Sequence, residues 1–124
     1  MVKLLLVDDE KGITDTLKGF FQYRGYTVDT ANRGEDAMNL VRSNKPRIVF
    51  LDIKMPDVDG LDVLNKIKEF DDSIKVIMLS TISDEAVVEK AKRFGADDFI
   101  SKPFRLDYLE GILLNYIQQF EGRL

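Results

Sequence analysis

The chain has 124 residues, which suits one domain with its own hydrophobic core and leaves little room for a second. Its composition is 44% hydrophobic and 32% charged, which argues against a disordered chain. Because it has no cysteine and no histidine, it cannot form disulfides, thiolate or imidazole metal sites, a Ser-His-Asp triad or a phosphohistidine. The net charge of −4, with both signs interspersed, argues against binding to a nucleic-acid backbone.

Short strands and amphipathic helices alternate along the chain. Continuous apolar runs are typical of strands buried on both faces of a parallel sheet, and apolar residues at three- and four-residue spacing are typical of helices. In the first half we expect a strand at 3–7, a helix with Ile13, Leu17, Phe20 and Phe21 inward, a strand at 26–31, a helix at 34–44 and a strand at 48–51. In the second half we expect a helix with Leu61, Leu64 and Ile67 inward, a strand at 75–79, a helix with Val87, Val88, Ala91 and Phe94 inward, a strand at 98–101 and a helix from about 105 to 120.

The boundaries of the helices carry ordinary start and stop signals. Gly25 and Gly95 are expected C-caps, and Pro46 prevents continuation of the second helix. Ser83 or Asp84 is the expected N-cap of the fourth helix. Since the longest apolar runs fall far short of the ~20 residues that span a bilayer, and the first is too short for a signal peptide, we expect a cytoplasmic protein.

Strict alternation of strands and helices predicts a parallel sheet with right-handed crossovers and helices on both faces. The predicted fold is a single α/β domain over residues 1–124, a doubly wound (βα)5, flavodoxin-like, three-layer sandwich. We expect the strand order 2-1-3-4-5 because it is the commonest one for five such strands, and not because the sequence requires it.

Asp52 is the residue that most needs a functional explanation. It ends the apolar run at 48–51, and Pro56 and Gly60 require the chain to turn soon afterwards. Ligands of open α/β sheets bind at the carboxyl ends of the strands. An aspartate in this position can act as a nucleophile toward phosphorus.

Under the expected strand order, polar residues follow four neighbouring strands. They are Asp8 and Asp9, Asp52, Ser80 and Thr81, and Lys102. A divalent cation such as Mg²⁺ would relieve the repulsion among crowded carboxylates. A single aspartate after a strand is more often a helix cap or a turn residue, so only the joint occurrence favours a functional site.

These motifs resemble the receiver domain of two-component response regulators, of the type found in chemotaxis regulators, over essentially the whole chain. The matching segments are LLLVDDE at 4–10, VFLDIKMPDVDGL at 49–61, VIMLST at 76–81 and GADDFISKPF at 95–104. The resemblance implies that Asp52 is the phosphoacceptor, and that Mg²⁺, for which Mn²⁺ can substitute, is held by Asp8, Asp9, Asp52 and the backbone carbonyl of Lys54.

The same resemblance assigns roles around the phosphoryl group. Ser80 matches the switch hydroxyl and Phe99 the switch aromatic, while Lys102 matches the lysine that pairs with the phosphoryl group. The Lys102–Pro103 bond matches a peptide that is usually cis. Lys54, Thr81 and Ile82 lie at variable positions that influence access to the phosphoryl group, and we expect Lys54 and Ile82 to slow its hydrolysis.

The implied function is a phosphoacceptor switch and not an enzyme acting on an external metabolite. A histidine kinase or phosphotransfer protein would phosphorylate Asp52, and the face made by the fourth helix, the fifth strand and the fifth helix would then bind a partner or a second copy differently. The partner is an unknown protein target or output domain, with no direct nucleic-acid or membrane binding. Whether the chain is a stand-alone receiver or part of a larger regulator is left open.

Three alternatives were weighed. A flavodoxin-like cofactor binder would need a phosphate loop where Asp8, Asp9 and Glu10 stand. A phosphatase using Asp52 as nucleophile would usually carry a second acid where Lys54 stands. A pseudo-receiver acting only as an interaction module is disfavoured by the intact acid cluster and Lys102.

Overall fold

The computed structural model describes residues 2–81 and 84–121, and these form five parallel strands alternating with five helices. The strands are β1 (Lys3–Val7), β2 (Thr27–Ala31), β3 (Ile48–Asp52), β4 (Lys75–Ser80) and β5 (Asp98–Ser101). The helices are α1 (Lys11–Tyr23), α2 (Gly34–Asn44), α3 (Gly60–Phe70), α4 (Glu85–Arg93) and α5 (Leu106–Glu121). The sheet order β2-β1-β3-β4-β5 confirms the predicted doubly wound, flavodoxin-like fold.

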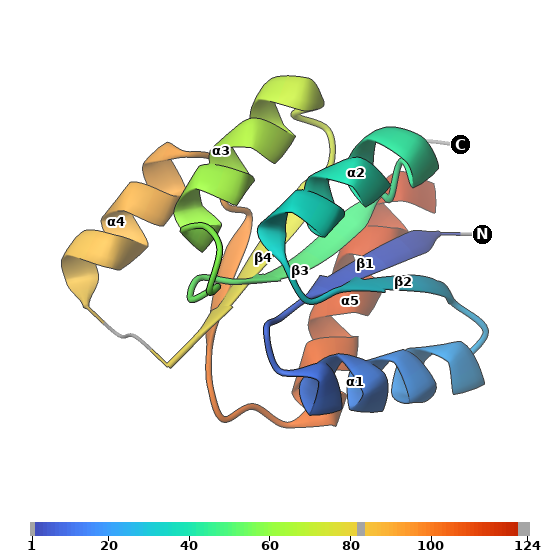
Figure 1. The fold of residues 1–124 in the computed structure, drawn as a ribbon. Coiled ribbons are helices and arrows are strands. Elements are labelled where there is room, and N and C mark those ends of the chain that lie inside the picture. The colour runs from blue at the N-terminus through green and yellow to red at the C-terminus, as the bar shows by residue number, and fades with distance from the viewer. Residues whose placement is uncertain (1, 82–83, 122–124) are drawn as a thin grey trace.

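Helices cover both faces of the sheet. Helices α2, α3 and α4 pack on one face and α1 and α5 on the other (Figure 1). The side chains of a strand alternate between the two layers: Leu5 belongs to the first core cluster, whereas Leu4 and Leu6 belong to the second. The continuous apolar run of β1 is therefore explained, because every position along it faces a covering helix.

The strands that carry continuous apolar runs lie in the middle of the sheet. β3 is buried along its whole length, and β4 is buried at all but its first residue. Strand β2, in which apolar and polar residues alternate along the sequence, lies at an edge, as the predicted strand order requires. In the part of the chain that the structure describes, no helix is long and apolar enough to cross a membrane.

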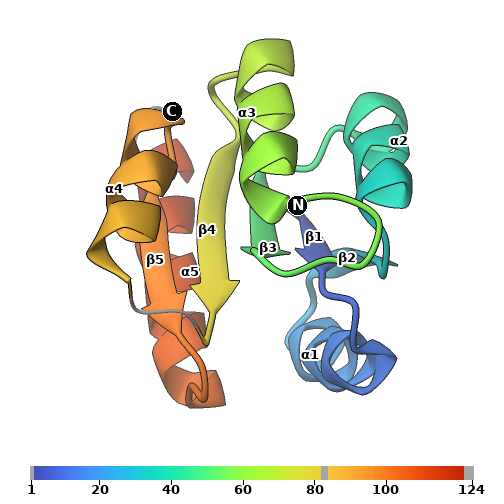
Figure 2. The same ribbon diagram turned by 60° about the vertical axis from the view of Figure 1, so that its left-hand side comes forward.

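Helix α4 differs most from its prediction. Ala91 is its one fully buried side chain, whereas Val87, Val88 and Phe94 are only half-buried. The side chain of Asp84 caps the helix by accepting a hydrogen bond from the Ala86 N–H, and the other predicted cap, Ser83, lies outside the described residues. Helix α4 buries little of its side-chain surface. The reason is its position near the edge strand β5, where less of the sheet lies beneath it (Figure 2).

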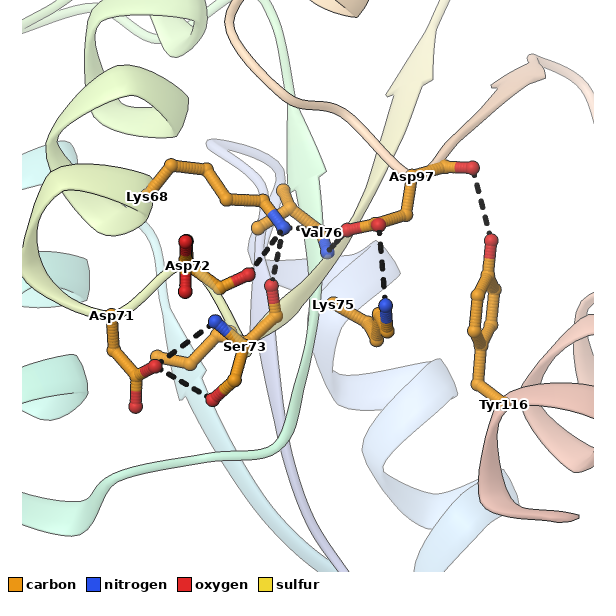
Figure 3. Close-up of polar contacts among 9 residues, drawn as sticks. Lys68, Asp71, Asp72, Ser73, Lys75, Val76, Asp97 and Tyr116 are labelled. Carbon is orange, nitrogen blue, oxygen red and sulfur yellow. Dashed lines mark hydrogen bonds and ion pairs between the residues drawn. The ribbon is translucent and has the colours of Figure 1, made fainter. Parts of the chain in front are cut away.

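A cluster of polar contacts fastens the amino ends of β4 and β5 (Figure 3). We call it the amino-edge cluster, and it comprises Lys68, Lys75, Asp97 and Tyr116. The Lys68 ammonium lies 2.7 Å from an Asp97 carboxylate oxygen, which also accepts a hydrogen bond from a β4 backbone N–H. The Tyr116 hydroxyl donates to the Asp97 carbonyl at 3.0 Å. The cluster thus joins α3, β4, the α4–β5 connection and α5 at the edge opposite the carboxyl ends of the strands.

Candidate functional site

Four polar side chains meet at the carboxyl edge of the sheet. Asp8 follows β1, Asp52 is the last residue of β3, Ser80 is the last residue of β4, and Lys102 follows β5. These strands are neighbours, so their carboxyl ends lie side by side. Ser80 was expected just beyond a strand but is paired with Ser101 inside the sheet. Because Ser80 is part of β4, its backbone is held by the sheet and not by a loop.

Burial separates these residues from ordinary surface charges. The exposed fractions of Asp8, Asp52 and Ser80 are 2%, 5% and 1%. Among the described residues, Thr14 is the one other buried polar residue. Since an ionised carboxylate in an apolar interior needs a countercharge or hydrogen bonds, the buried aspartates have to be compensated locally.

The Lys102 ammonium provides that compensation. Its Nζ lies 2.5 Å from Asp8 Oδ2 and 3.5 Å from Asp52 Oδ2, and its side chain is 11% exposed. Backbone N–H groups stabilise the opposite oxygens: that of Glu10 donates to Asp8 Oδ1 at 3.0 Å, and that of Lys54 donates to Asp52 Oδ1 at 3.3 Å. One ammonium is therefore shared by two buried carboxylates, which leaves the group with net negative charge.

Burial, together with this excess of negative charge, changes the ionisation of Asp52. Burial and the neighbouring charge of Asp8 raise the pKa of Asp52 to about 6, although Lys102 and the Lys54 N–H act in the opposite direction. Burial alone would lower the pKa of Lys102, but the hydrogen bond to Asp8 and the charge of Asp52 outweigh it and raise that pKa. The Lys102 side chain thus remains a cation at neutral pH. Further positive charge near Asp52 would stabilise the ionised form of its carboxyl group.

The donor set fits a hard divalent cation. Carboxylate oxygens of Asp8, Asp9 and Glu10 lie within 4.8 Å of one another, and Asp9 and Glu10 are exposed, so the group opens to solvent. Oxygen-rich sites that keep some bound water are those that Mg²⁺ prefers. Glu10 was not among the metal ligands predicted from the sequence, and the structure places its carboxylate beside those of Asp8 and Asp9.

The remaining site residues lie on the loops around this centre. The Lys102 N–H donates to the Ser80 carbonyl at 2.8 Å, and the Lys102–Pro103 peptide bond is cis. Lys54 and Thr81 are exposed, and Phe99 is half-buried against the core cluster under α2, α3 and α4. Ile82 lies outside the described residues.

Two residues that support Asp8 were missed from the sequence. The Asn32 side-chain amide donates to the Asp8 carbonyl at 2.8 Å and to the Thr14 hydroxyl at 3.0 Å. Thr14 in turn donates to the Lys11 carbonyl. Asn32 follows β2 and Thr14 belongs to α1, so only the spatial closeness of β1 and β2 reveals the link.

Comparison with known proteins places this arrangement in a family. Residues 4–113 match the family model described as the response regulator receiver domain. The chain therefore belongs to the response regulator receiver domain family. Such domains are signalling phosphoacceptors that generally bind Mg²⁺ at an acidic cluster and interact with histidine kinases or phosphotransfer proteins and with output domains.

Individual relatives agree with this assignment. The chain is 32% identical over 115 residues to sporulation initiation phosphotransferase F of Bacillus subtilis, covering 93% of each protein. It is 42% identical over 104 residues to response regulator SaeR of Staphylococcus epidermidis, and the match spans 45% of that protein. A CheY-like receiver domain structure from Methanospirillum hungatei superposes over 100% of the chain and 99% of that protein, with a TM-score of 0.95 at 24% identity, which supports the fold.

Proposed function

We propose that this chain is a phosphoacceptor switch in which Asp52 takes a phosphoryl group from a histidine kinase or a phosphohistidine relay protein. One observation carries the proposal: Asp52 is a buried carboxylate at the end of the central strand β3, with the Lys102 ammonium 3.5 Å away and the acid group around Asp8 beside it. A buried aspartate serving only as a cap or turn residue would not need a shared lysine and a second buried acid.

The proposed transfer is a substitution at phosphorus. A carboxylate oxygen of Asp52 forms the new O–P bond as the P–N bond of the phosphohistidine breaks, and the imidazole leaves with the electron pair and takes a proton from solvent. Lys102 then pairs with a phosphoryl oxygen, so its attraction shifts from Asp8 toward the product. Ser80 is the candidate hydroxyl for the same group.

The metal belongs to the proposal as well. We assign Asp8, Asp9, Asp52 and the Lys54 carbonyl as ligands of Mg²⁺, with Mn²⁺ as a substitute. Held by these ligands, the ion would supply positive charge beside the phosphoryl oxygens. The crowding of the acids supports this assignment, because carboxylate oxygens of Asp8, Asp9 and Glu10 lie within 4.8 Å of one another and the buried Asp52 shares Lys102 with Asp8.

A groove beside the site suits the approach of a protein phosphodonor. It has a volume of about 440 Å³ and lies between α1 and the segment that leads into α5, where Ile13, Leu17 and Phe104 provide an apolar lining next to Lys102 and Thr81. An apolar face of the donor placed here would hold its phosphohistidine near Asp52.

The output would follow from a change in the α4–β5–α5 face. Phosphorylation adds about two negative charges next to Lys102 and Ser80. A shift of Ser80 toward the phosphoryl group would move the end of β4. This strand pairs with β5, which contains Phe99, so the movement would be transmitted to that aromatic side chain. Since α4 has one fully buried side chain, repacking of this face disturbs little core. Partner binding, or pairing of two copies, would change accordingly.

The chain is proposed to catalyse only its own phosphorylation and dephosphorylation. Lys54, exposed beside the site, is proposed to limit the access of water to the aspartyl phosphate, and Thr81, also exposed there, to affect access for the phosphodonor. Lys54→Asn is expected to speed the decay of the phosphorylated protein. An unchanged decay rate would contradict the role assigned to Lys54.

Intact-mass spectrometry after incubation with phosphoramidate tests the central proposal. The wild type is expected to gain one phosphoryl group in the presence of Mg²⁺, Asp52→Asn to gain none, and Asp72→Asn, which removes an exposed acid distant from Lys102, to behave as the wild type. No Mg²⁺-dependent gain in the wild type would refute the proposal and favour a receiver fold that serves only as an interaction module.

A further inference from the structure

Helix α2 begins without a capping side chain of its own. Arg33 occupies the N-cap position and makes no side-chain cap hydrogen bond. Asp57, in the loop between β3 and α3, acts instead: the Gly34 N–H donates to its Oδ1 at 3.1 Å and the Glu35 N–H more weakly to its Oδ2 at 3.4 Å. A carboxylate at this end of a helix also complements the helix dipole. The cap of α2 is therefore supplied by the loop that follows the phosphoacceptor.

Close packing reinforces this contact. A Cβ atom at residue 34 would lie 2.1 Å from Val58 Cγ2 and 3.1 Å from Val63 Cγ2, so Gly34 leaves just enough room for the loop. Figure 2 shows the loop between β3 and α3 extending toward the first turn of α2. The ion pair between Arg33 and Asp57, at 3.9 Å with an exposed arginine, adds little to this.

The same loop is closed at its base. Lys54 and Asp59 form an antiparallel bridge, and the Gly60 N–H donates to the Ile53 carbonyl at 2.7 Å. The short segment between Lys54 and Asp57 is thus held at both ends, at its base by the bridge and at its tip by α2. The orientation of the Lys54 carbonyl consequently depends on both attachments.

We propose that Asp57 is a positioning residue of the Mg²⁺ site, which holds the loop carrying the Lys54 carbonyl by capping α2 from a distance. This inference rests on the proposed function, because it takes that carbonyl as a metal ligand. Asp57 makes no contact with the metal in this scheme. The hydrogen bond from the Gly34 N–H lowers the pKa of Asp57, so the cap stays charged at neutral pH.

The test is the Mg²⁺ dissociation constant, measured by calorimetric titration of the whole chain. Asp57→Ala is expected to weaken binding by about tenfold, the size of effect seen when residues that orient metal ligands are removed. Asp57→Asn keeps an oxygen that can accept from the Gly34 N–H and is expected to restore most of the affinity.

Asp71→Ala is the matched control. Asp71 also uses its carboxylate to hold a turn, accepting from the Ser73 N–H at 3.0 Å and the Ser73 hydroxyl at 2.6 Å, and its pKa is likewise lowered by these bonds. It lies before β4, at the opposite edge of the sheet (Figure 3). Its loss should lower thermal stability but leave the Mg²⁺ dissociation constant unchanged.

A second readout needs no metal. Amide hydrogen exchange in metal-free protein should be faster at residues 53–59 in Asp57→Ala than in the wild type, and unchanged there in Asp71→Ala. If Asp57→Ala does not fold, Gly34→Ala takes its place, because the added Cβ would displace Val58 and the loop while favouring the helix itself. It should also weaken Mg²⁺ binding.

The outcomes separate this inference from the function on which it rests. Wild type that binds Mg²⁺, together with Asp57→Ala or Gly34→Ala that binds it equally well, would overturn the positioning role and leave the proposed function intact. Wild type that does not bind Mg²⁺ would refute the metal site and the inference with it.

Discussion

Replacing Asp52 with asparagine should stabilise the metal-free protein at neutral pH, although it removes the proposed phosphoacceptor. Asparagine keeps the shape of the side chain and removes its charge. The folded structure raises the pKa of Asp52 from 3.8 to about 6, mainly through burial and then through the charge of Asp8. An acid with a higher pKa in the folded state binds more protons when folded, so its ionisation opposes folding.

The magnitude follows from that difference in pKa. At about 1.4 kcal/mol for each pKa unit, ionised Asp52 costs roughly 3 kcal/mol of folding free energy. Asparagine has a single acceptor oxygen, so either Lys102 or the Lys54 N–H loses a partner, at a cost of about 1 kcal/mol. The net gain in the free energy of unfolding is therefore about 2 kcal/mol. Lys102 keeps its contact with Asp8 in either case.

Urea unfolding at several pH values, with a chelator present, measures this gain. The destabilising effect of Asp52 is absent below its unfolded pKa of 3.8, grows as the pH rises, and is complete above its folded pKa of about 6. The difference in unfolding free energy between Asp52→Asn and wild type should therefore increase from pH 4 to pH 7. Asp72→Asn removes an exposed charge and should change stability by less than about 0.5 kcal/mol.

A difference that stays constant or shrinks between pH 4 and pH 7 would refute the reasoning, because it would mean that burial does not penalise the charge of Asp52. Adding millimolar Mg²⁺ offers a further check. Binding to the wild type stabilises its folded state and should narrow the gap to Asp52→Asn.

Two further substitutions test a backbone hydrogen bond and a close backbone approach, both by urea unfolding. Tyr116→Phe removes the hydrogen bond to the Asp97 carbonyl and should lower stability by about 1 kcal/mol, whereas Tyr108→Phe, at an exposed position, should have almost no effect. Equal losses would contradict the assigned contact. Gly60→Ala should cost at least about 2 kcal/mol, because its Cβ would lie 2.3 Å from a β3 carbonyl oxygen, while Gly12→Ala meets nothing within 4 Å. An unchanged free energy of unfolding in both alanine variants would show that the backbone around Gly60 can move to accommodate a Cβ atom, and would contradict this prediction.

Most of the fold could be predicted because its signals are local. The unbroken apolar run at 48–51 predicts a strand covered on both faces, and the alternation at 26–31 predicts the edge strand. The burial of α4 was predicted less well. Helical spacing predicts which side faces inward, but the depth of burial depends on how much sheet lies beneath, and α4 lies near an edge.

Some residues of the candidate site could likewise be predicted from local sequence signals, and others could not. Asp8, Asp52 and Lys102 could be proposed from the sequence because each follows a strand and parallel strands align their carboxyl ends. Asn32 and Asp57 could not. Each acts through a hydrogen bond to a segment distant in the sequence, and neither leaves a local pattern.

The amino-edge cluster has a consequence for how a signal could move through the domain. Tyr116 fastens the later part of α5 to Asp97, while the first turn of α5, at Leu106, lies about 15 Å away along the helix axis. If phosphorylation displaces the segment near Lys102, we expect the displacement to decrease along α5 from Leu106 to Tyr116, because the later part of the helix is held at Asp97. A partner that distinguishes the two states would then contact the first turn of α5 in preference to the end at Tyr116.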